Sequence, residues 1–465
     1  MRVKPEISQR TAAAVLLFCL LTIHWTSAQA MAFCGFYIGK ADAHLYNHAS
    51  QVVYVRNGNR TVLSIMNDYQ GEPSQFALVV PVPVVLQKEQ IHVGDRELFS
   101  HLDAYSSPRL VEYYDPDPCA PMMSMREAAP MASAAAGSPA NSAERAKSLG
   151  VTIEAHYTVG EYDIEILSAT QSQGLETYLL ESGYKLPLGV SRALEPYIRQ
   201  DMKFFVAKVN LQEHQRTGLT YLRPIQFAFE SPKFMLPIRL GMVNSQGPQD
   251  LVIYLLTRDG RVETTNYRTV KMPTGYDLPE YIQEQFADFY KAMFSEQVRQ
   301  AEMRAVFTEY VWNMGEFCDP CAAAPLSSNE LRQLGVFWLN ETLPPSAYPG
   351  PPTIPYEGQG PGQVIITRLH LRYSAATFPE DLMFQETEDR ENFQARYVLR
   401  HAWAGSPQTC AAASSYFEQL RGRRETEAAT LADLTGWNLK QIYTKIGFTP
   451  SDMPKPANWW QHLWQ

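Results

Sequence analysis

Cys318 and Cys321 are the residues of this 465-residue chain whose types and spacing most suggest chemistry. Two thiols in a Cys-x-x-Cys pair can cycle between dithiol and disulfide, and a helix start lowers the pKa of one of them. A thioredoxin-like unit needs alternating strands and helices around the pair, whereas the strand signals here arrive as hairpins. Glu316 and Asp319 also oppose a thiolate beside the pair. We expect a structural bridge or a short staple, with a redox centre or a metal site as the alternatives.

Four further cysteines affect which disulfide bridges this pair could form. Cys19 lies in a segment that we expect to be removed, which leaves Cys34, Cys119 and Cys410 beside the pair. The local option joins Cys318 to Cys321, and the natural second bridge joins Cys34 to Cys119, leaving Cys410 free. A bridge from the pair to Cys410 fits the same five thiols. We therefore treat Cys34, Cys119, Cys318 and Cys321 as disulfide or redox candidates.

Other chemistry has weaker support in the sequence. His44 and His48 stand four residues apart with Asp42 nearby, a spacing that suits metal ligands on a helix, but the strand-like residues that follow favour surface histidines. The chain contains no nucleophile elbow, phosphate-binding loop, dinucleotide fingerprint or zinc-protease motif. We assign no catalytic residue, cofactor or metal ligand, although an unfamiliar hydrolase or glycosidase stays an alternative.

The first thirty residues have the three-part pattern of a secretory signal peptide. Arg2, Lys4 and Arg10 form a basic start, residues 11–23 are apolar, and the small residues 28–30 end the segment. The apolar run is short for a bilayer span, which takes about 20 residues. We expect cleavage after Ala30, or after Ala32, to release a mature chain into the periplasm or medium without a transmembrane segment. An uncleaved anchor is the alternative.

Composition and charge limit the partners. The chain is 45% apolar, which predicts a globular protein, and its 40 basic and 49 acidic residues give a net charge of -9. This acidic balance argues against nucleic acid and against an anionic membrane surface as partners.

Strand signals between residues 35 and 275 predict an α+β fold. Asn57-Gly58 and Asp259-Gly260 each separate two strand-like runs and predict tight hairpins. Residues 151–159 alternate between apolar and polar side chains, with His156 on the polar face, as in an antiparallel sheet with one buried face. We expect mainly antiparallel sheet with a few packed helices.

The sequence pattern predicts two helices. One begins at Asp277, with Glu280 completing a capping box, and carries a core-facing stripe that includes Ile282, Phe289 and Met293. The other spans residues 411–434, where three arginines form a solvated face: Arg421, Arg423 and Arg424.

We expect one large α+β domain over residues 31–450. Residues 120–149 are rich in Ala, Met and Pro and predict a flexible insertion, and residues 344–362 predict a Pro/Gly-rich linker or loop. Residues 451–465 form an aromatic tail whose side chains could dock on the body, bind a partner or lie at a membrane interface; we favour docking. The side chains that define this tail are Trp459, Trp460, His462, Leu463 and Trp464.

A faint internal similarity relates two segments. Glu72, Phe76 and the following ALVVPVPV resemble Glu230, Phe234 and the following MLPIRLGM. Proline in both strands favours an edge or a bulge. The similarity indicates either two related β-units or coincidence.

Several blocks resemble the bacterial exported domain-of-unknown-function family 2330. They are residues 34–86, residues 90–119, the segment LRPIQFAFESPKFMLPIRLGMVN, the CDPC pair and the LTGW motif at residues 434–437. The resemblance implies one long extracytoplasmic domain of bacterial origin. It implies no activity, catalytic residue or cofactor.

We therefore expect a non-catalytic exported protein that binds or organises an envelope partner, which could be a protein, a glycan or a small molecule. The alternative from another class is a thiol–disulfide oxidoreductase that uses Cys318 and Cys321.

Overall fold

The computed structural model describes residues 49–66, 77–120, 146–147, 150–182, 186, 189–219, 221–243, 247–317, 323–340 and 363–448. Several sequence predictions lie outside these residues and stay predictions. They concern the signal peptide, His44 and His48, most of the insertion at 120–149, the loop at 344–362, the tail at 451–465, and Cys34, Cys318 and Cys321.

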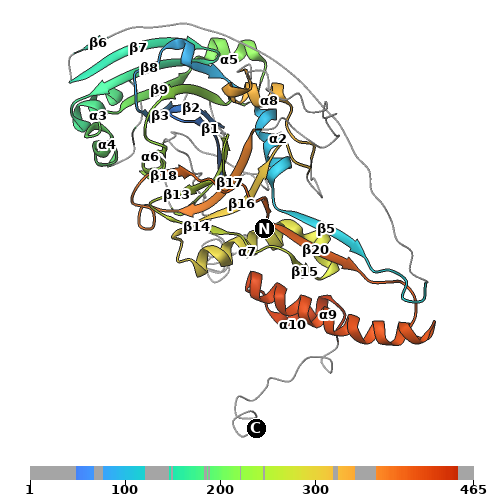
Figure 1. The fold of residues 1–465 in the computed structure, drawn as a ribbon. Helices are drawn as coiled ribbons and strands as arrows, with labels where there is room; N and C mark the ends of the chain where they lie inside the picture. The colour runs from blue at the N-terminus through green and yellow to red at the C-terminus, as the bar shows by residue number, and fades with distance from the viewer. Residues whose placement is uncertain are drawn as a thin grey trace, which may run out of the picture.

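A mixed sheet forms the centre of the described structure (Figure 1). Its strands lie in the order β14-β16-β17-β12-β1-β2-β10-β4, and β19 pairs with β16. The predicted Asn57-Gly58 hairpin is confirmed, because β1 and β2 pair antiparallel around Gly58, whose φ of 60° suits glycine. The bounds are β14 (Arg268–Lys271), β16 (Ala305–Asn313), β17 (Ile365–Tyr373), β12 (Gln249–Thr257), β1 (Ala49–Asn57), β2 (Arg60–Ile65), β10 (Ile225–Glu230), β4 (Ile91–Val93) and β19 (Phe393–Gln394).

The second predicted hairpin, at Asp259-Gly260, is wrong. Strand β12 has neighbours on both sides, since it pairs parallel with β1 and antiparallel with β17. The chain therefore leaves the central sheet after the turn, and the Val262 amide donates to Thr367 Oγ1 at 3.0 Å. The next strand, β13 (Val262–Thr264), pairs with β18 (Leu382–Glu386), which also pairs with β11 (Met235–Leu236).

A second sheet is antiparallel throughout and has the order β3-β9-β8-β7-β6. Its strands are β3 (Ala77–Val82), β9 (Lys203–Val209), β8 (Tyr162–Ala169), β7 (Val151–Val159) and β6 (Ala146–Lys147). The predicted alternation is confirmed: Ala155 and Tyr157 are buried, whereas His156 is exposed. Strand β6 lies within residues 120–149, the segment for which we predict a flexible insertion, and pairs with β7; the insertion itself stays a prediction.

The two sheets share the largest apolar core. Side chains from both contribute, among them Val52 and Leu63 from the central sheet and Leu78, Ile164 and Phe205 from the second. The other face of the second sheet is covered by α3 (Ser172–Glu181), α4 (Val190–Ile198) and α6 (Arg239–Val243). The other face of the central sheet packs against α2 (Arg96–Ser106), α8 (Ser328–Gln333) and the 3-10 helix η4 (Phe337–Asn340). Two further short helices are η2 (Lys88–Gln90) and α5 (Leu211–Thr217).

A small parallel sheet carries the C-terminal helices, which lie beneath it in Figure 1. Its strands are β15 (Tyr276–Leu278), β20 (Arg396–His401) and β5 (Arg109–Tyr114), and its helices are η3 (Glu280–Gln285), α7 (Phe286–Gln300), α9 (Ala411–Thr435) and α10 (Leu439–Lys445). The prediction of a helix start at Asp277 is wrong, since Asp277 lies in β15 and pairs with Arg400 at 3.0 Å. The core-facing stripe is confirmed, with Ile282, Phe289 and Met293 buried.

The predicted α+β class is confirmed, because most strand pairs are antiparallel and the helices pack on the sheets. No helix in the described part of the chain is long and apolar enough to cross a membrane.

Candidate functional site

A cleft of about 220 Å³ lies between the central sheet and the second sheet. Its floor is Leu63 from β2 together with Phe227 and Phe229 from β10, which all belong to the core shared by the two sheets. The thioether side chains of Met202 and Met235 form part of the wall. The cleft therefore borders the main apolar core, whose residues at this point are almost fully buried.

Prolines line both sides of this cleft. Pro81 and Pro83 come from β3 and the residues after it, and Pro232 and Pro237 come from the segment around β11. Strand β3 is the outermost described strand of its sheet, and Pro81 lacks the N–H that a further strand would need. The two Pro-containing segments of the faint internal similarity thus meet at one cleft, and the predicted edge position of Pro81 is confirmed.

Arg56 holds the rim of the cleft in place. Its buried guanidinium donates to the Ser231 carbonyl at 3.0 Å and to Thr61 Oγ1 at 2.9 Å, and lies 4.9 Å from the centre of the Phe234 ring. Burial lowers the pKa of Arg56, but its hydrogen bonds to oxygen compensate part of the lost hydration. Sequence reasoning missed this residue. The available signal was a single arginine in an otherwise apolar strand, and such a residue does not by itself indicate a cleft.

The mouth of the cleft is polar. Lys233 Nζ donates to Gln200 Oε1 at 2.7 Å, and both side chains are exposed. Glu230 also lines the cleft, and its carboxylate lies 3.9 Å from Arg60. An apolar interior with a few polar groups at its opening is the arrangement of a binding pocket.

A second cleft, of about 330 Å³, is more polar and lies beside β4 and the start of α2. It is lined by His92, Asp95 and Arg223, among others. Asp95 already accepts the Glu97 amide as the helix cap, and Arg223 is paired with the buried Glu161 at 2.6 Å. Burial and the Arg223 cation lower the pKa of His92. Because its main charged groups have partners, this cleft offers less for a ligand than the proline-lined one.

A cluster of ionic side chains around Glu309 is buried inside the fold and lines neither cleft. Glu309 accepts from Arg368 Nε at 2.6 Å and pairs with His370 Nδ1 at 2.6 Å, while Arg368 Nη1 donates to Asp103 at 2.7 Å. Glu309 lies at an irregularity in the pairing of β16 with β17, and such bulges redirect a side chain. Burial raises the pKa of Glu309, but His370 and Arg368 outweigh it and the net shift is downward.

Phe294 from α7 stacks on the His370 ring, with the two ring centres 3.7 Å apart. Neither cleft is lined by Glu309, Arg368 or His370. The cluster therefore joins β16, β17 and α2 inside the fold, and we assign it a structural role.

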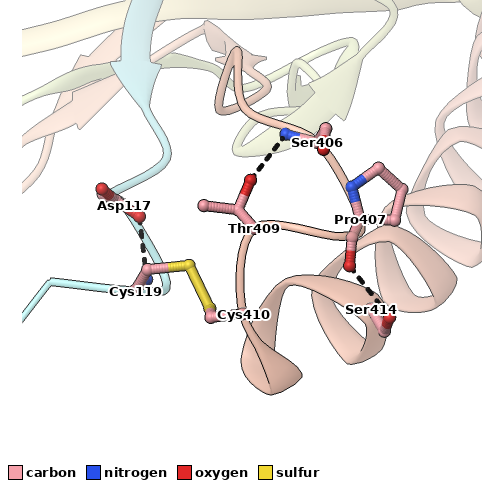
Figure 2. Close-up of a disulfide and its surroundings, with 7 residues drawn as sticks. All are labelled: Asp117, Cys119, Ser406, Pro407, Thr409, Cys410 and Ser414. Atoms are coloured by element: carbon pink, nitrogen blue, oxygen red, sulfur yellow. Dashed lines mark hydrogen bonds between the residues drawn. A yellow bond between two sulfur atoms is a disulfide. The ribbon is translucent and has the colours of Figure 1, made fainter.

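Cys119 and Cys410 form a disulfide between segments that are 291 residues apart, with their Cα atoms 6.1 Å from each other (Figure 2). This corrects the expected pairing of Cys34 with Cys119 and the expectation that Cys410 is free. The reason is topological: β5 and β20 pair in parallel, so the segments that follow them leave the sheet side by side. Two separated strands that become neighbours only in the folded sheet could not be paired from the sequence. Cys34, Cys318 and Cys321 lie outside the described residues, so their roles stay predictions.

The same two segments are joined by further contacts. Asp115, just after β5, accepts from the Tyr416 hydroxyl at 2.6 Å and pairs with Arg423 at 2.8 Å. The predicted solvated face of α9 is therefore wrong for Arg423, whose side chain also lies 3.3 Å from Glu427. Burial raises the pKa of Glu427 to about 7, although Arg423 acts in the opposite direction. Arg421 is the most exposed of the three arginines, and Arg424 is also partly exposed, which fits the predicted solvated face at these two positions.

The described residues show no group of three or more His, Cys, Asp or Glu side chains arranged to hold a metal ion. Comparison with protein families gives one finding: the model for an "Uncharacterized protein conserved in bacteria (DUF2330)" matches residues 28–385. No curated protein and no solved structure matches the chain.

Proposed function

This chain belongs to the bacterial family DUF2330, and we propose that it is a non-catalytic exported protein that binds an apolar group of an envelope partner. The binding site in this proposal is the proline-lined cleft between the central and the second sheet.

The observation that carries the proposal is the form of the cleft. Its lining includes Phe229, a residue of the main core that is 7% exposed, and its mouth carries the exposed side chains of Lys233 and Glu230. Apolar surface at the base binds a ligand by removing it from water, and the polar groups at the mouth orient it. Among the alternatives that the sequence left open, this favours an apolar group over an extended glycan.

The disulfide supports the extracytoplasmic part of the proposal. A bridge between Cys119 and Cys410 forms and persists in an oxidising compartment, whereas cytoplasmic thiols are kept reduced. The signal-peptide pattern of residues 1–30 agrees with this.

Filling the cleft should abolish binding of an apolar probe. Val84 lines the cleft and its neighbour Val85 does not, although both are partly buried against the same core. We expect the mature protein to bind anilinonaphthalene sulfonate saturably, Val84→Trp to weaken that binding at least about tenfold, and Val85→Trp to retain it. The measurement is a fluorescence titration.

Circular dichroism and thermal unfolding of both variants provide the control, since this dye also binds partly unfolded protein. Equal binding by wild type and by a folded Val84→Trp variant, or no binding by the wild type, would contradict the proposal.

A further inference from the structure

We propose that the group bound in the proline-lined cleft is an aromatic ring about the size of indole, presented by a peptide segment of the partner. This inference rests on the proposed function and names its ligand. Four properties of the cleft lead to it.

The first property is size. The cleft holds about 220 Å³. An apolar cavity of about 150 Å³ takes up benzene, and pockets for drug-sized molecules begin at about 300 Å³. The volume therefore suits one ring system larger than benzene, and it is too small for a large lipid or a folded element.

The second property is the chemistry of the walls. Phe227 stands between two further rings, with its centre 5.2 Å from that of Phe205 and 6.3 Å from that of Phe229. A ring that enters the cleft meets Phe229, which is 7% exposed and packs against the fully buried Phe227, and aromatic pairs gain more than their buried area alone provides. The sulfur atoms of Met202 and Met235 add contacts that favour an aromatic over an aliphatic guest.

The third property is a backbone that lacks donors. A peptide can bind a sheet edge by adding a strand, and this mode depends on main-chain hydrogen bonds. Pro81 lies in the outermost described strand of its sheet, Pro83 follows it, and neither residue has an N–H to donate. Strand addition at β3 is therefore weak. Recognition must come from a side chain that enters the cleft.

The fourth property is the polar mouth, which suits the backbone of a peptide on either side of the inserted ring. Among the described residues, Lys233 gives one of its three N–H donors to Gln200 Oε1, which leaves donors for a peptide carbonyl. The Glu230 carboxylate can accept a peptide N–H at the same mouth. A bare hydrocarbon makes no use of these groups.

The test compares three small probes on the mature full chain by calorimetry or ligand-observed NMR: N-acetyltryptophanamide, N-acetylleucinamide and indole. We expect the tryptophan amide to bind at least about tenfold more tightly than the leucine amide and more tightly than indole. We also expect Val84→Trp to abolish this binding and Val85→Trp to preserve it.

Each other outcome is decisive. If the leucine amide binds the cleft as tightly as the tryptophan amide, the aromatic assignment fails while the proposed function stands. If indole binds as tightly as the tryptophan amide, the peptide assignment fails. If no probe binds although the fluorescent dye does, the aromatic peptide assignment fails while the proposed function stands; if the dye does not bind either, the proposed function fails as well.

The chain's own aromatic tail is a competing occupant. A variant with Trp459→Ala, Trp460→Ala and Trp464→Ala should bind the tryptophan amide as the wild type does. If binding appears only in this variant, the tail fills the cleft, and the assignment to a partner is overturned.

Discussion

Replacing Arg368 with alanine should lower the free energy of unfolding by about 3–5 kcal/mol, the range measured when a buried ion pair loses one partner. Arg368 is buried and donates to Glu309, which is fully buried, and to Asp103, which is partly exposed. Its removal leaves the Glu309 carboxylate with the His370 ring and the Tyr290 hydroxyl as hydrogen-bond partners, and without the guanidinium charge. Urea unfolding of the two proteins measures the difference.

The matched control is Arg390→Ala. Arg390 pairs with Asp259 at 3.3 Å, and both side chains are more than half exposed. Exposed pairs contribute about 0–1 kcal/mol, so this variant should stay close to the wild type. A loss below about 1 kcal/mol for Arg368→Ala would contradict the structural role that we assign to the cluster.

The effect of Arg368→Ala should depend on pH in one direction. Arg368 contributes to holding the pKa values of Glu309 and Asp103 below their ordinary values, against the effect of burial. Carboxyl groups with lowered pKa values stabilise the folded state above their unfolded pKa values, near 4, and this contribution is lost as pH falls. The difference between wild type and variant should therefore shrink below about pH 4. A difference that stays constant or grows in acid would contradict this explanation.

Removing the disulfide with Cys119→Ala and Cys410→Ala should lower the free energy of unfolding by about 2–4 kcal/mol. The bridge closes a loop between segments 291 residues apart, and most of its effect arises from restricting the unfolded chain. The folded state should loosen only locally. The first turns of α9 are largely exposed, whereas Ala428, Leu431 and Leu434 near its end are buried.

Hydrogen exchange measures this local effect. We expect faster exchange in the first half of α9 of the double variant and little change in its second half. Treating the wild type with a dithiol should reproduce this pattern, and the same treatment should leave the double variant unchanged. Identical unfolding and exchange of wild type, reduced wild type and double variant would contradict the account.

Local signals predicted some elements and misled on others, for identifiable physical reasons. Asn57-Gly58 and Asp259-Gly260 have the same turn chemistry, but only the first joins paired strands. Strand β12 already pairs with β1 and β17 on its two sides, so the strand that follows Asp259-Gly260 cannot pair with it. Similarly, Asp277 has the sequence of a helix cap but pairs with Arg400 from a neighbouring strand.

The sequence predicted less of the candidate site than of the fold. Pro81 and Pro237 were visible as prolines in strand-like segments; Pro81 lies in the edge strand β3, as could be expected, whereas Pro237 follows β11. That both segments line one cleft depends on the packing of two sheets, which no local pattern records. The partner of Cys119 depended in the same way on the parallel pairing of β5 with β20.

The central claim is that the protein works outside the cytoplasm with its disulfide formed. The most direct measurement is mass mapping of the unreduced protein from separated cell fractions. The account predicts a periplasmic or secreted chain that begins at Met31, or at Phe33 after the alternative cleavage, with Cys119 and Cys410 in one linked pair of peptides. A cytoplasmic chain that retains residues 1–30 and carries Cys119 and Cys410 as free thiols would contradict it.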